Sequence, residues 1–268
     1  MKGCRENVSM LLENKVAVIT GGGRGIGRAI AQAYAREGAH LALAARDVVA
    51  LQETRALVAE YARDILVVPL DLREEESVSA MAEEVLMHFG HVDILVNNSG
   101  IAGPTAPLWE ISPAEWRETL EVDLTGPYLC CRAFLPSMLA RRSGNILMIG
   151  SMTGKRALFG RAPYAAAKLG LVGLVRTLAW EVGPYNIRVN LISPGPVEGE
   201  RIGRVLQNMA VSQGISIDEA RQLFLRDSPL GRMVPPADIA NAAVYLASDL
   251  SGSTTGEDLN VSGGIVMY

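Results

Sequence analysis

Short apolar runs rich in β-branched residues alternate with longer amphipathic segments along the whole chain. Seven runs have the length and composition of buried strands, namely 16–20, 41–45, 65–70, 94–97, 145–149, 188–192 and 257–261. The segments between them are long enough for the helical crossovers that parallel strands need. This alternation predicts an α/β fold with one doubly wound parallel sheet of about seven strands and helices on both faces.

Two long helical patterns stand out, at about 113–140 and 163–182. The first has a readable start, because Ser112 can cap the helix, Pro113 fits its first turn and Glu115 completes a capping box. Both patterns are rich in small and apolar residues. These faces either only pack on the sheet or also form a subunit interface, and composition leaves both readings open.

The chain has 268 residues, 49% hydrophobic content and a net charge of -4, which fits one domain of ordinary surface charge. We expect an extension at 1–14 and the domain at 15–268. The acidic balance argues against a nucleic-acid or membrane partner. No segment has the length of a membrane span or the core of a signal peptide. The cysteines Cys4, Cys130 and Cys131 form no disulfide framework, so we expect a reducing, cytoplasmic location.

A glycine-rich string, 20–27, follows the first strand directly and precedes a helical pattern. Glycines allow a tight turn, and their amides can approach an anion at the positive end of the helix. Strand, glycine string and helix together are the context in which a dinucleotide pyrophosphate binds. The expected contacts come from Gly21, Gly23, Arg24, Gly25, Ile26 and Gly27.

Ligands of such sheets lie outside the carboxyl ends of the strands. The residues that follow the fourth, fifth and sixth strands are polar or glycine-bearing: 97–100, 150–151 and 193–197. Tyr164 and Lys168 are four residues apart near a helix start, so their side chains can meet. An ammonium beside a phenol favours the phenolate, and Ser151 can hold a substrate oxygen by hydrogen bonding. Such a set suits hydride chemistry on a carbonyl and needs no metal.

From about residue 15 onward the chain resembles the short-chain dehydrogenase/reductase family, and most closely its 3-oxoacyl-acyl carrier protein reductase-like group. The resemblance lies in Thr20–Gly27, Asp71, the run 97–100, Ser151, Tyr164 with Lys168, Asn190 and Pro194–Gly195. It implies a Rossmann-type fold and a general acid/base role for Tyr164. Lys168 then activates the phenol and holds the nicotinamide ribose, while Ser151 orients the carbonyl.

The same resemblance assigns further cofactor contacts. Asp71 and Leu72 flank the adenine, Asn98 the adjoining ribose and Val197 the nicotinamide carboxamide, with Ser99, Gly100, Pro194 and Gly195 beside them. Two residues depart from the family pattern. Ser99 stands where alanine is usual, which we expect to be tolerated. Asp123 stands where asparagine is usual, and a carboxylate accepts hydrogen bonds but cannot donate them, so we expect a weakened member of the proton relay.

The choice of dinucleotide depends on the end of the second strand, which reads Ala44-Ala45-Arg46-Asp47. A carboxylate there selects NAD through the ribose 2′-hydroxyl, whereas arginine suits the 2′-phosphate of NADP. Ala45 aligns with the position of the acid, and Arg46 follows it, with Arg24 close by. We therefore predict NADP(H), with NAD(H) as the alternative if Asp47 turns to the ribose; Arg46 paired to Asp47 is the structural alternative.

The segment 198–232 is helical but irregular, and we interpret it as a substrate lid whose arginines are mainly solvated. Glu198, Glu200 or Arg201 can lie near the substrate. The apolar tail after Gly264 is expected to dock, which agrees with the family's frequent homotetramers; a homodimer is the alternative. The predicted function is hydride transfer between NADP(H) and a ketone or secondary alcohol. The alternatives are an NAD-linked polyol or sugar dehydrogenase and a non-catalytic dinucleotide-binding partner.

Overall fold

The computed structural model describes residues 10–62 and 64–268. A seven-stranded sheet runs through it, with every neighbouring pair parallel and the spatial order β3-β2-β1-β4-β5-β6-β7. The strands are β1 Val16–Thr20, β2 His40–Ala45, β3 Ile65–Pro69, β4 Ile94–Asn97, β5 Gly144–Ile149, β6 Ile187–Pro194 and β7 Asp258–Val261. The seven predicted runs are these strands, so the predicted fold class is confirmed.

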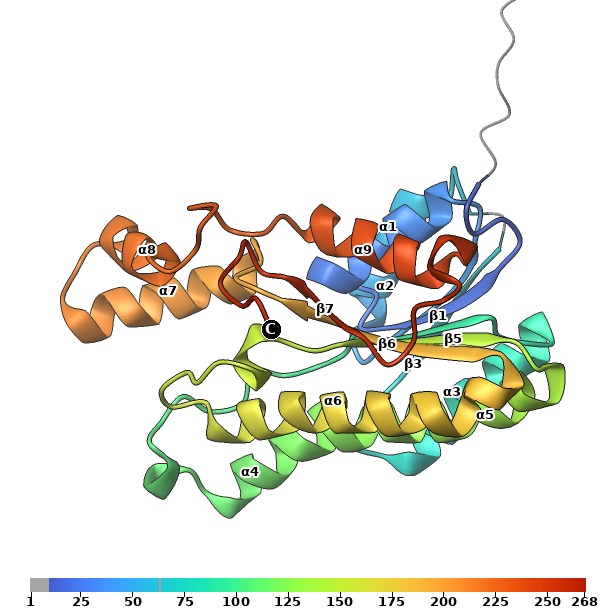
Figure 1. Ribbon diagram of the computed structural model, residues 1–268, viewed down its shortest axis with the longest axis horizontal. Coiled ribbons are helices and arrows are strands. Elements are labelled where there is room, and N and C mark those ends of the chain that lie inside the picture. Colours follow the sequence, from blue (N-terminus) through green and yellow to red (C-terminus); the bar gives the residue numbers. More distant parts are fainter. Residues whose placement is uncertain (1–9, 63) are drawn as a thin grey trace, which may run out of the picture.

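Helices cover both faces of the sheet (Figure 1). One face carries α1 Gly25–Arg36, α2 Val48–Val58 and α9 Pro236–Ala247. The other carries α3 Glu75–Phe89, α5 Gly126–Arg141 and α6 Ala162–Val182. The remaining helices are α4 Pro113–Leu120, α7 Glu200–Gln213 and α8 Ile217–Leu225, with short turns at Leu108–Glu110, Met152–Gly154, Gly183–Tyr185 and Asp249–Ser251. Figure 1 shows α7 and α8 projecting beyond one edge of the sheet.

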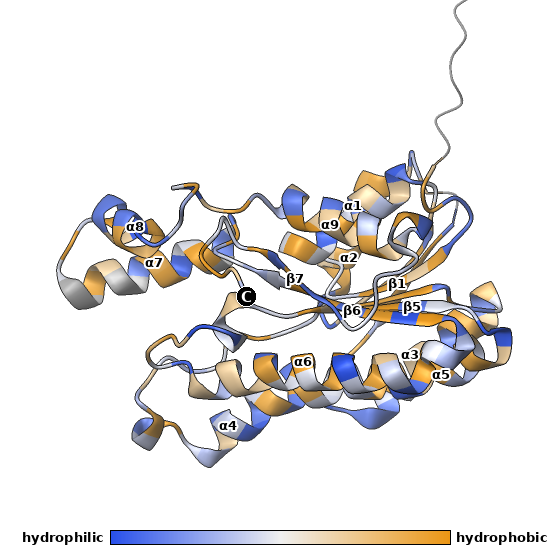
Figure 2. Cartoon of the chain, viewed as in Figure 1, coloured by the Kyte–Doolittle hydropathy of each residue, from blue (hydrophilic) through white to orange (hydrophobic). Residues whose placement is uncertain are grey.

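Burial on both faces explains the continuous apolar runs of the strands. In β1, Val16 and Val18 belong to the core under α3, α5 and α6, whereas Ala17 and Ile19 belong to the core under α1 and α9. Successive side chains of a strand point to opposite faces, so both sets must be apolar. The central strands are accordingly hydrophobic in Figure 2.

The long helix predicted from 113 to about 140 is interrupted. It consists of α4, a π-helical segment at Glu121–Thr125, and α5. The amide of Gly126 donates to the carbonyl of Glu121, five residues back. Pro127 has no amide hydrogen to donate four residues back, and this loss favours the wider turn. The capping box predicted at the start of α4 is present, with Ser112 and Glu115 each accepting from the other's amide.

Both ends of the described chain pack on the domain. The amide of Leu12 donates to the carbonyl of Glu37 at 3.0 Å, and the Leu12 side chain is buried, so the described part of the expected extension contributes to the core. At the other end Val266 is buried, whereas Met267 and Tyr268 are exposed. The phenol of Tyr268 donates to the carbonyl of Lys155 at 3.1 Å.

The described residues contain no helix long and apolar enough to cross a membrane. Cys130 and Cys131 are buried free thiols in α5, and burial raises the pKa of Cys131 to about 12 and that of Cys130 further still. These thiols are therefore protonated and unreactive at neutral pH. Cys4 lies outside the described residues.

Candidate active site

A cleft of about 1750 Å³ runs along the carboxyl ends of the strands. Its wall includes residues that follow each of β1 to β6, and residues of the segment that carries α7 and α8 also line it. Sites for one small molecule usually measure about 300–1,000 Å³, so this cleft has room for two ligands side by side. It is centred where the strand order reverses, between β1 and β4, which is the expected place for a dinucleotide.

The glycine string forms a tight turn between β1 and α1. Gly21 has φ +67° and its amide donates to the carbonyl of Ala44 at 2.7 Å. Gly27 sits at the start of α1 so close to this turn that a Cβ would lie 2.2 Å from the Gly21 carbonyl oxygen. Only glycine fits there, and the helix start is thereby held against the loop. This cradle fits a pyrophosphate at the N-terminus of α1.

Side chains join this loop to the turn after β4. The hydroxyl of Thr20 accepts hydrogen bonds from the amides of Asn98 and Ser99, both at 3.0 Å. The Asn98 side-chain amide donates to the carbonyls of Thr20 at 2.9 Å and Gly21 at 3.2 Å. Asn98 therefore positions the glycine loop, a role the sequence analysis did not foresee, in addition to lining the cleft where a ribose is expected.

At the far end of the cleft, Arg24 forms an ion pair with Asp47. The other oxygen of Asp47 accepts from the amide of Ala50 at 3.0 Å, which caps α2. Both oxygens of Asp47 are thus engaged by its own neighbours. The partner of Asp47 is Arg24, so the pairing of Arg46 with Asp47 that the sequence left open is not observed, and Arg46 lines the cleft.

Asp71, directly after β3, is fixed by a bidentate contact with Arg73. The Arg73 Nε and Nη2 atoms lie 2.9 and 2.5 Å from the two carboxylate oxygens. Hydrogen bonding from Arg73 lowers the pKa of Asp71 to about 2, and the charge of Arg46 acts in the same direction. Leu72 beside it is buried and lines the cleft, so the two residues present a carboxylate acceptor and an apolar surface to the cleft.

At the opposite end, α6 presents Tyr164 and Lys168 on one face. The Lys168 Nζ atom lies 5.6 Å from the centroid of the Tyr164 ring. Both side chains are more than nine-tenths buried but reach the cleft. The Lys168 ammonium donates to the carbonyl of Ile149, at the end of β5, at 3.1 Å. The Lys168 ammonium therefore lies beside the Tyr164 ring in the wall of the cleft.

Asp123 lies behind this pair, fully buried in the π-helical segment. Its Oδ1 atom accepts from the amide of Ile101 at 2.7 Å, and its Oδ2 atom lies 3.8 Å from Lys168 Nζ. Asp123 thus connects the loop after β4 to the lysine. π-Helical turns occur often at functional sites, and here the turn directs the carboxylate inward.

Ser151 follows β5 on the cleft wall. Its hydroxyl oxygen accepts from the amide of Thr153 at 3.1 Å. A hydroxyl that accepts one bond retains its proton for donation, so Ser151 can donate to a substrate oxygen.

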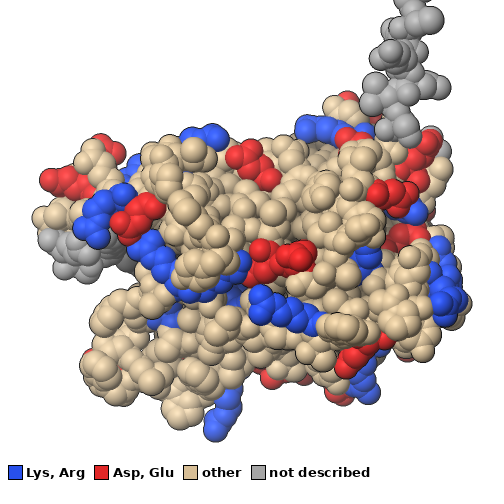
Figure 3. Space-filling view, in the orientation of Figure 1, with Lys and Arg blue, Asp and Glu red and all other residues tan. Residues whose placement is uncertain are grey.

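The turn after β6 and the segment that carries α7 and α8 complete the site. A Cβ on Gly195 would lie 2.7 Å from Ser262 Cα, so the Pro194–Gly195 turn packs directly on the chain after β7. Val197 pairs with Val234 in an isolated bridge, which joins the two ends of the segment that carries α7 and α8. Across the mouth, Arg156 and Asp227 form an ion pair at 2.5 Å. Figure 3 shows basic and acidic side chains between the part that carries α7 and α8 and the layer of α6.

The structure brings the predicted site residues together. All of them line the cleft except Gly27 and Asp123, which lie directly behind its wall. Glu198 and Glu200 also line it, whereas the side chain of Arg201 lies outside what the structure describes. Residues that the sequence analysis missed are Arg73, Arg156, Arg161 and Asp227, which lie on loops whose positions no local pattern reveals.

Fold and site together define a nucleotide-dependent oxidoreductase. Residues 21–266 match a family model described as enoyl-(acyl carrier protein) reductase. The 3-oxoacyl-[acyl-carrier-protein] reductase of Chlamydia trachomatis serovar D is 36% identical over 259 residues, which are 96% of this chain and 100% of that protein.

Two solved structures have similar folds. A variant of actinorhodin polyketide ketoreductase with NADPH has a TM-score of 0.91 at 32% identity, covering 95% of this chain and 98% of that one. A 7α-hydroxysteroid dehydrogenase with NADH and a 7-oxo bile acid has a TM-score of 0.88 at 32% identity, covering 96% of both chains. The chain belongs to the short-chain dehydrogenase/reductase family, whose enzymes act on CH–OH and C=O groups with NAD or NADP.

Proposed function

We propose that this enzyme transfers hydride between NADP(H) and a ketone or secondary alcohol, with Tyr164 as the general acid/base. The observation that carries the proposal is the cluster of Ser151, Tyr164 and Lys168 on the wall of one cleft, with Lys168 Nζ 5.6 Å from the centroid of the Tyr164 ring. Phenol, ammonium and hydroxyl are the groups that move a proton to and from a carbonyl oxygen. A bound nicotinamide supplies or accepts the hydride.

The protein's own residues would handle the proton. In reduction, Ser151 donates a hydrogen bond to the carbonyl oxygen, and Tyr164 gives its phenolic proton to that oxygen as negative charge develops. Lys168 stabilises the phenolate that remains. Asp123 and the carbonyl of Ile149 hold the ammonium in place. In oxidation the phenolate takes the proton back from the alcohol.

The dinucleotide would lie with its pyrophosphate on Gly21, Gly23, Gly25 and Ile26, its adenine against Asp71 and Leu72, and the adjoining ribose near Asn98. Val197 would flank the nicotinamide carboxamide, and Ser99, Gly100, Pro194 and Gly195 would line the cleft beside the cofactor. We infer a preference for NADP(H) from the charges at the ribose end. Arg24 neutralises Asp47, which leaves Arg46 in the cleft to meet a 2′-phosphate. Similar structures contain NADPH in one case and NADH in another. The inferred preference therefore rests on Arg24, Arg46 and Asp47 and not on family membership.

Binding of the two cofactors tests this preference. We expect the purified protein to bind NADPH at least tenfold more tightly than NADH. Arg46→Glu should lower NADPH affinity by about tenfold or more, since it adds repulsion to the 2′-phosphate, and leave NADH affinity nearly unchanged. Arg55→Ala, on the exposed side of α2, is the control and should change neither value. Equal or tighter NADH binding would support the NAD-linked alternative.

A substrate panel tests the chemistry. Ketones, oxoacyl thioesters, polyols and sugars would be screened with both cofactors by nicotinamide absorbance. Tyr164→Phe should lower kcat on the best substrate at least a hundredfold, while NADPH still binds. Full activity of this variant would contradict the role of Tyr164 as the general acid/base. Failure of the natural protein to turn over any compound of the panel would instead support the non-catalytic binding partner.

We also propose that the protein works in the cytoplasm as a homotetramer or homodimer. Support for association comes from three large apolar side chains exposed on α5 and α6: Trp180 is 87% exposed, Leu169 56% and Tyr128 46%. An exposed apolar face of this kind usually meets a partner. Trp180→Lys should then reduce the mass measured by light scattering. A monomeric mass for both the natural protein and Trp180→Lys would contradict the proposal.

A further inference from the structure

Arg161, the residue before α6, stacks on the proposed catalytic tyrosine. Its guanidinium carbon lies 4.9 Å from the centroid of the Tyr164 ring. It is the second cation close to this ring, because Lys168 Nζ lies 5.6 Å from the same centroid. Nothing in the reaction as described above uses Arg161.

The same guanidinium is tied to the loop that follows β4. Its Nη2 atom donates to the carbonyl of Ala102 at 2.6 Å, and its Nη1 atom donates to Thr105 Oγ1 at 3.2 Å. The amide of Ala106 donates to the carbonyl of Gly160 at 3.1 Å, which joins the two segments a second time. These bonds fix the guanidinium plane over the ring before any substrate binds.

We propose that Arg161 is a positioning residue for the Tyr164 phenol, an inference that rests on the proposed role of Tyr164 as general acid/base. Proton transfer requires the phenol within about 2.6–3.2 Å of the substrate oxygen, and small misplacements cost large factors in rate. Tyr164 lies in the first turn of α6, where the helix backbone fixes its Cβ and the groups packed around the ring limit its rotation. A planar cation anchored over one face restricts that rotation.

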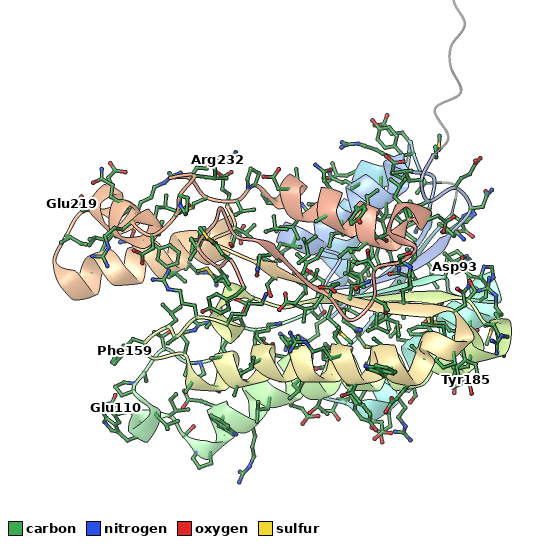
Figure 4. All side chains as sticks on the ribbon, viewed as in Figure 1. Asp93, Glu110, Phe159, Tyr185, Glu219 and Arg232 are labelled. Carbon is green, nitrogen blue, oxygen red and sulfur yellow. The ribbon has the colours of Figure 1, made fainter. Side chains whose placement is uncertain are left out.

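The chain offers a matched control at the other end of α6. The Arg142 guanidinium carbon lies 5.4 Å from the Tyr185 ring centroid, and its Nη2 atom donates to the carbonyl of Pro184 at 2.6 Å. Figure 4 shows Tyr185 at the end of the helix opposite to Phe159, which lines the cleft. Arg142→Met therefore removes the same kind of contact far from the reaction.

The test uses the full-length protein with its best substrate. Arg161→Met should lower kcat by about tenfold, the size of effect expected from a desolvated cation–π contact. KM and the Kd for NADPH should stay within twofold, and the solvent deuterium isotope effect on kcat should rise, because proton transfer is the step impaired. Arg161→Lys keeps a cation near the ring, so its kcat should be at least threefold higher than that of Arg161→Met. Without ligand, the Ala106 amide of Arg161→Met should exchange its hydrogen faster than the same amide of the natural protein.

A loss of kcat no larger than that of Arg142→Met would overturn the proposal, and so would a loss confined to KM or an unchanged isotope effect. If thermal unfolding shows that Arg161→Met does not fold, Thr105→Val replaces it, since this variant removes one hydrogen bond from the guanidinium and no charge. It should lower kcat two- to threefold at constant KM, and an unchanged kcat would overturn the proposal. Retained activity in Tyr164→Phe would instead refute the proposed function.

Discussion

The ammonium of Lys168 lies 3.8 Å from the carboxylate of Asp123, and both side chains are buried. Because the pair is shielded from water, its charges act on each other and on Tyr164 with little screening. The negative charge of Asp123, where the family usually carries an amide, therefore acts on the lysine that the proposed reaction uses. This relationship gives the first prediction.

Asp123→Asn should turn over as fast as the natural protein or faster, with a changed pH profile. Asparagine keeps an oxygen to accept from the Ile101 amide but removes the charge beside Lys168. Breaking the buried pair should also lower the free energy of unfolding by about 1–3 kcal/mol. Kinetics across pH and urea unfolding measure both effects. Asp123→Ala, which also loses the acceptor, should be the less stable variant, and a collapse of activity in Asp123→Asn would show that the carboxylate itself takes part.

Gly27→Ala should destroy nucleotide binding and lower the melting temperature, because its methyl would lie 2.2 Å from the Gly21 carbonyl oxygen. Gly173→Ala is the matched control. It also lies in a helix, but its Cβ would meet nothing within 4 Å, so it should melt at the same temperature or higher. Differential scanning calorimetry with and without NADPH measures the contrast. Normal NADPH binding by Gly27→Ala would disprove the steric account of the loop.

Asp71 should contribute to stability only above its depressed pKa. Its pKa falls from an ordinary 3.8 to about 2 through hydrogen bonding to Arg73, so the folded state binds the proton less readily than the unfolded state. The contribution is complete above about pH 4 and disappears as the pH falls toward 2. Urea unfolding should find Asp71→Asn less stable than the natural protein at pH 6 but equally stable near pH 2. A stability gap that is independent of pH would contradict this account.

If the segment 198–232 acts as the predicted lid, the ion pair of Arg156 and Asp227 should govern how it meets the rest of the site. Hydrogen bonding from Arg156 lowers the pKa of Asp227, yet both side chains are more than two-fifths exposed, so salt should weaken the contact. Asp227→Asn should change KM for the substrate, and the difference from the natural protein should shrink at 0.5 M salt. Thermal stability should change little. Identical KM values at low salt would show that the pair does not affect the lid.

The sheet was predictable because β1 and β4 are buried on both faces and leave an unbroken apolar signal. The break in the helix after Leu120 was not, because Glu121–Thr125 contains no glycine or proline, and only Gly126 and Pro127 mark the change of hydrogen-bond register. Tyr164 and Lys168 were predictable because the helix itself sets their spacing. The geometric role of Asn98 was not, since it depends on the distance between two strands far apart in sequence.

Arg161 illustrates the same limit within the site. It stands three residues before Tyr164, but its position over the ring depends on Ala102 and Thr105, which reach it from another loop. Likewise the pairing of Arg24 with Asp47 was open in the sequence, because Arg46 is adjacent to the same carboxylate. Charged side chains on loops choose partners by tertiary placement, which local patterns do not encode.

The bonds from Thr20 and Asn98 join the glycine string to the turn after β4, so neither segment holds its shape alone. Transplanting only residues 20–27 into another strand–helix unit would lose the hydrogen bonds that stabilise the loop. The unit that could be transferred is the ends of β1 and β4 together with Thr20 and Asn98, whose hydrogen bonds join them.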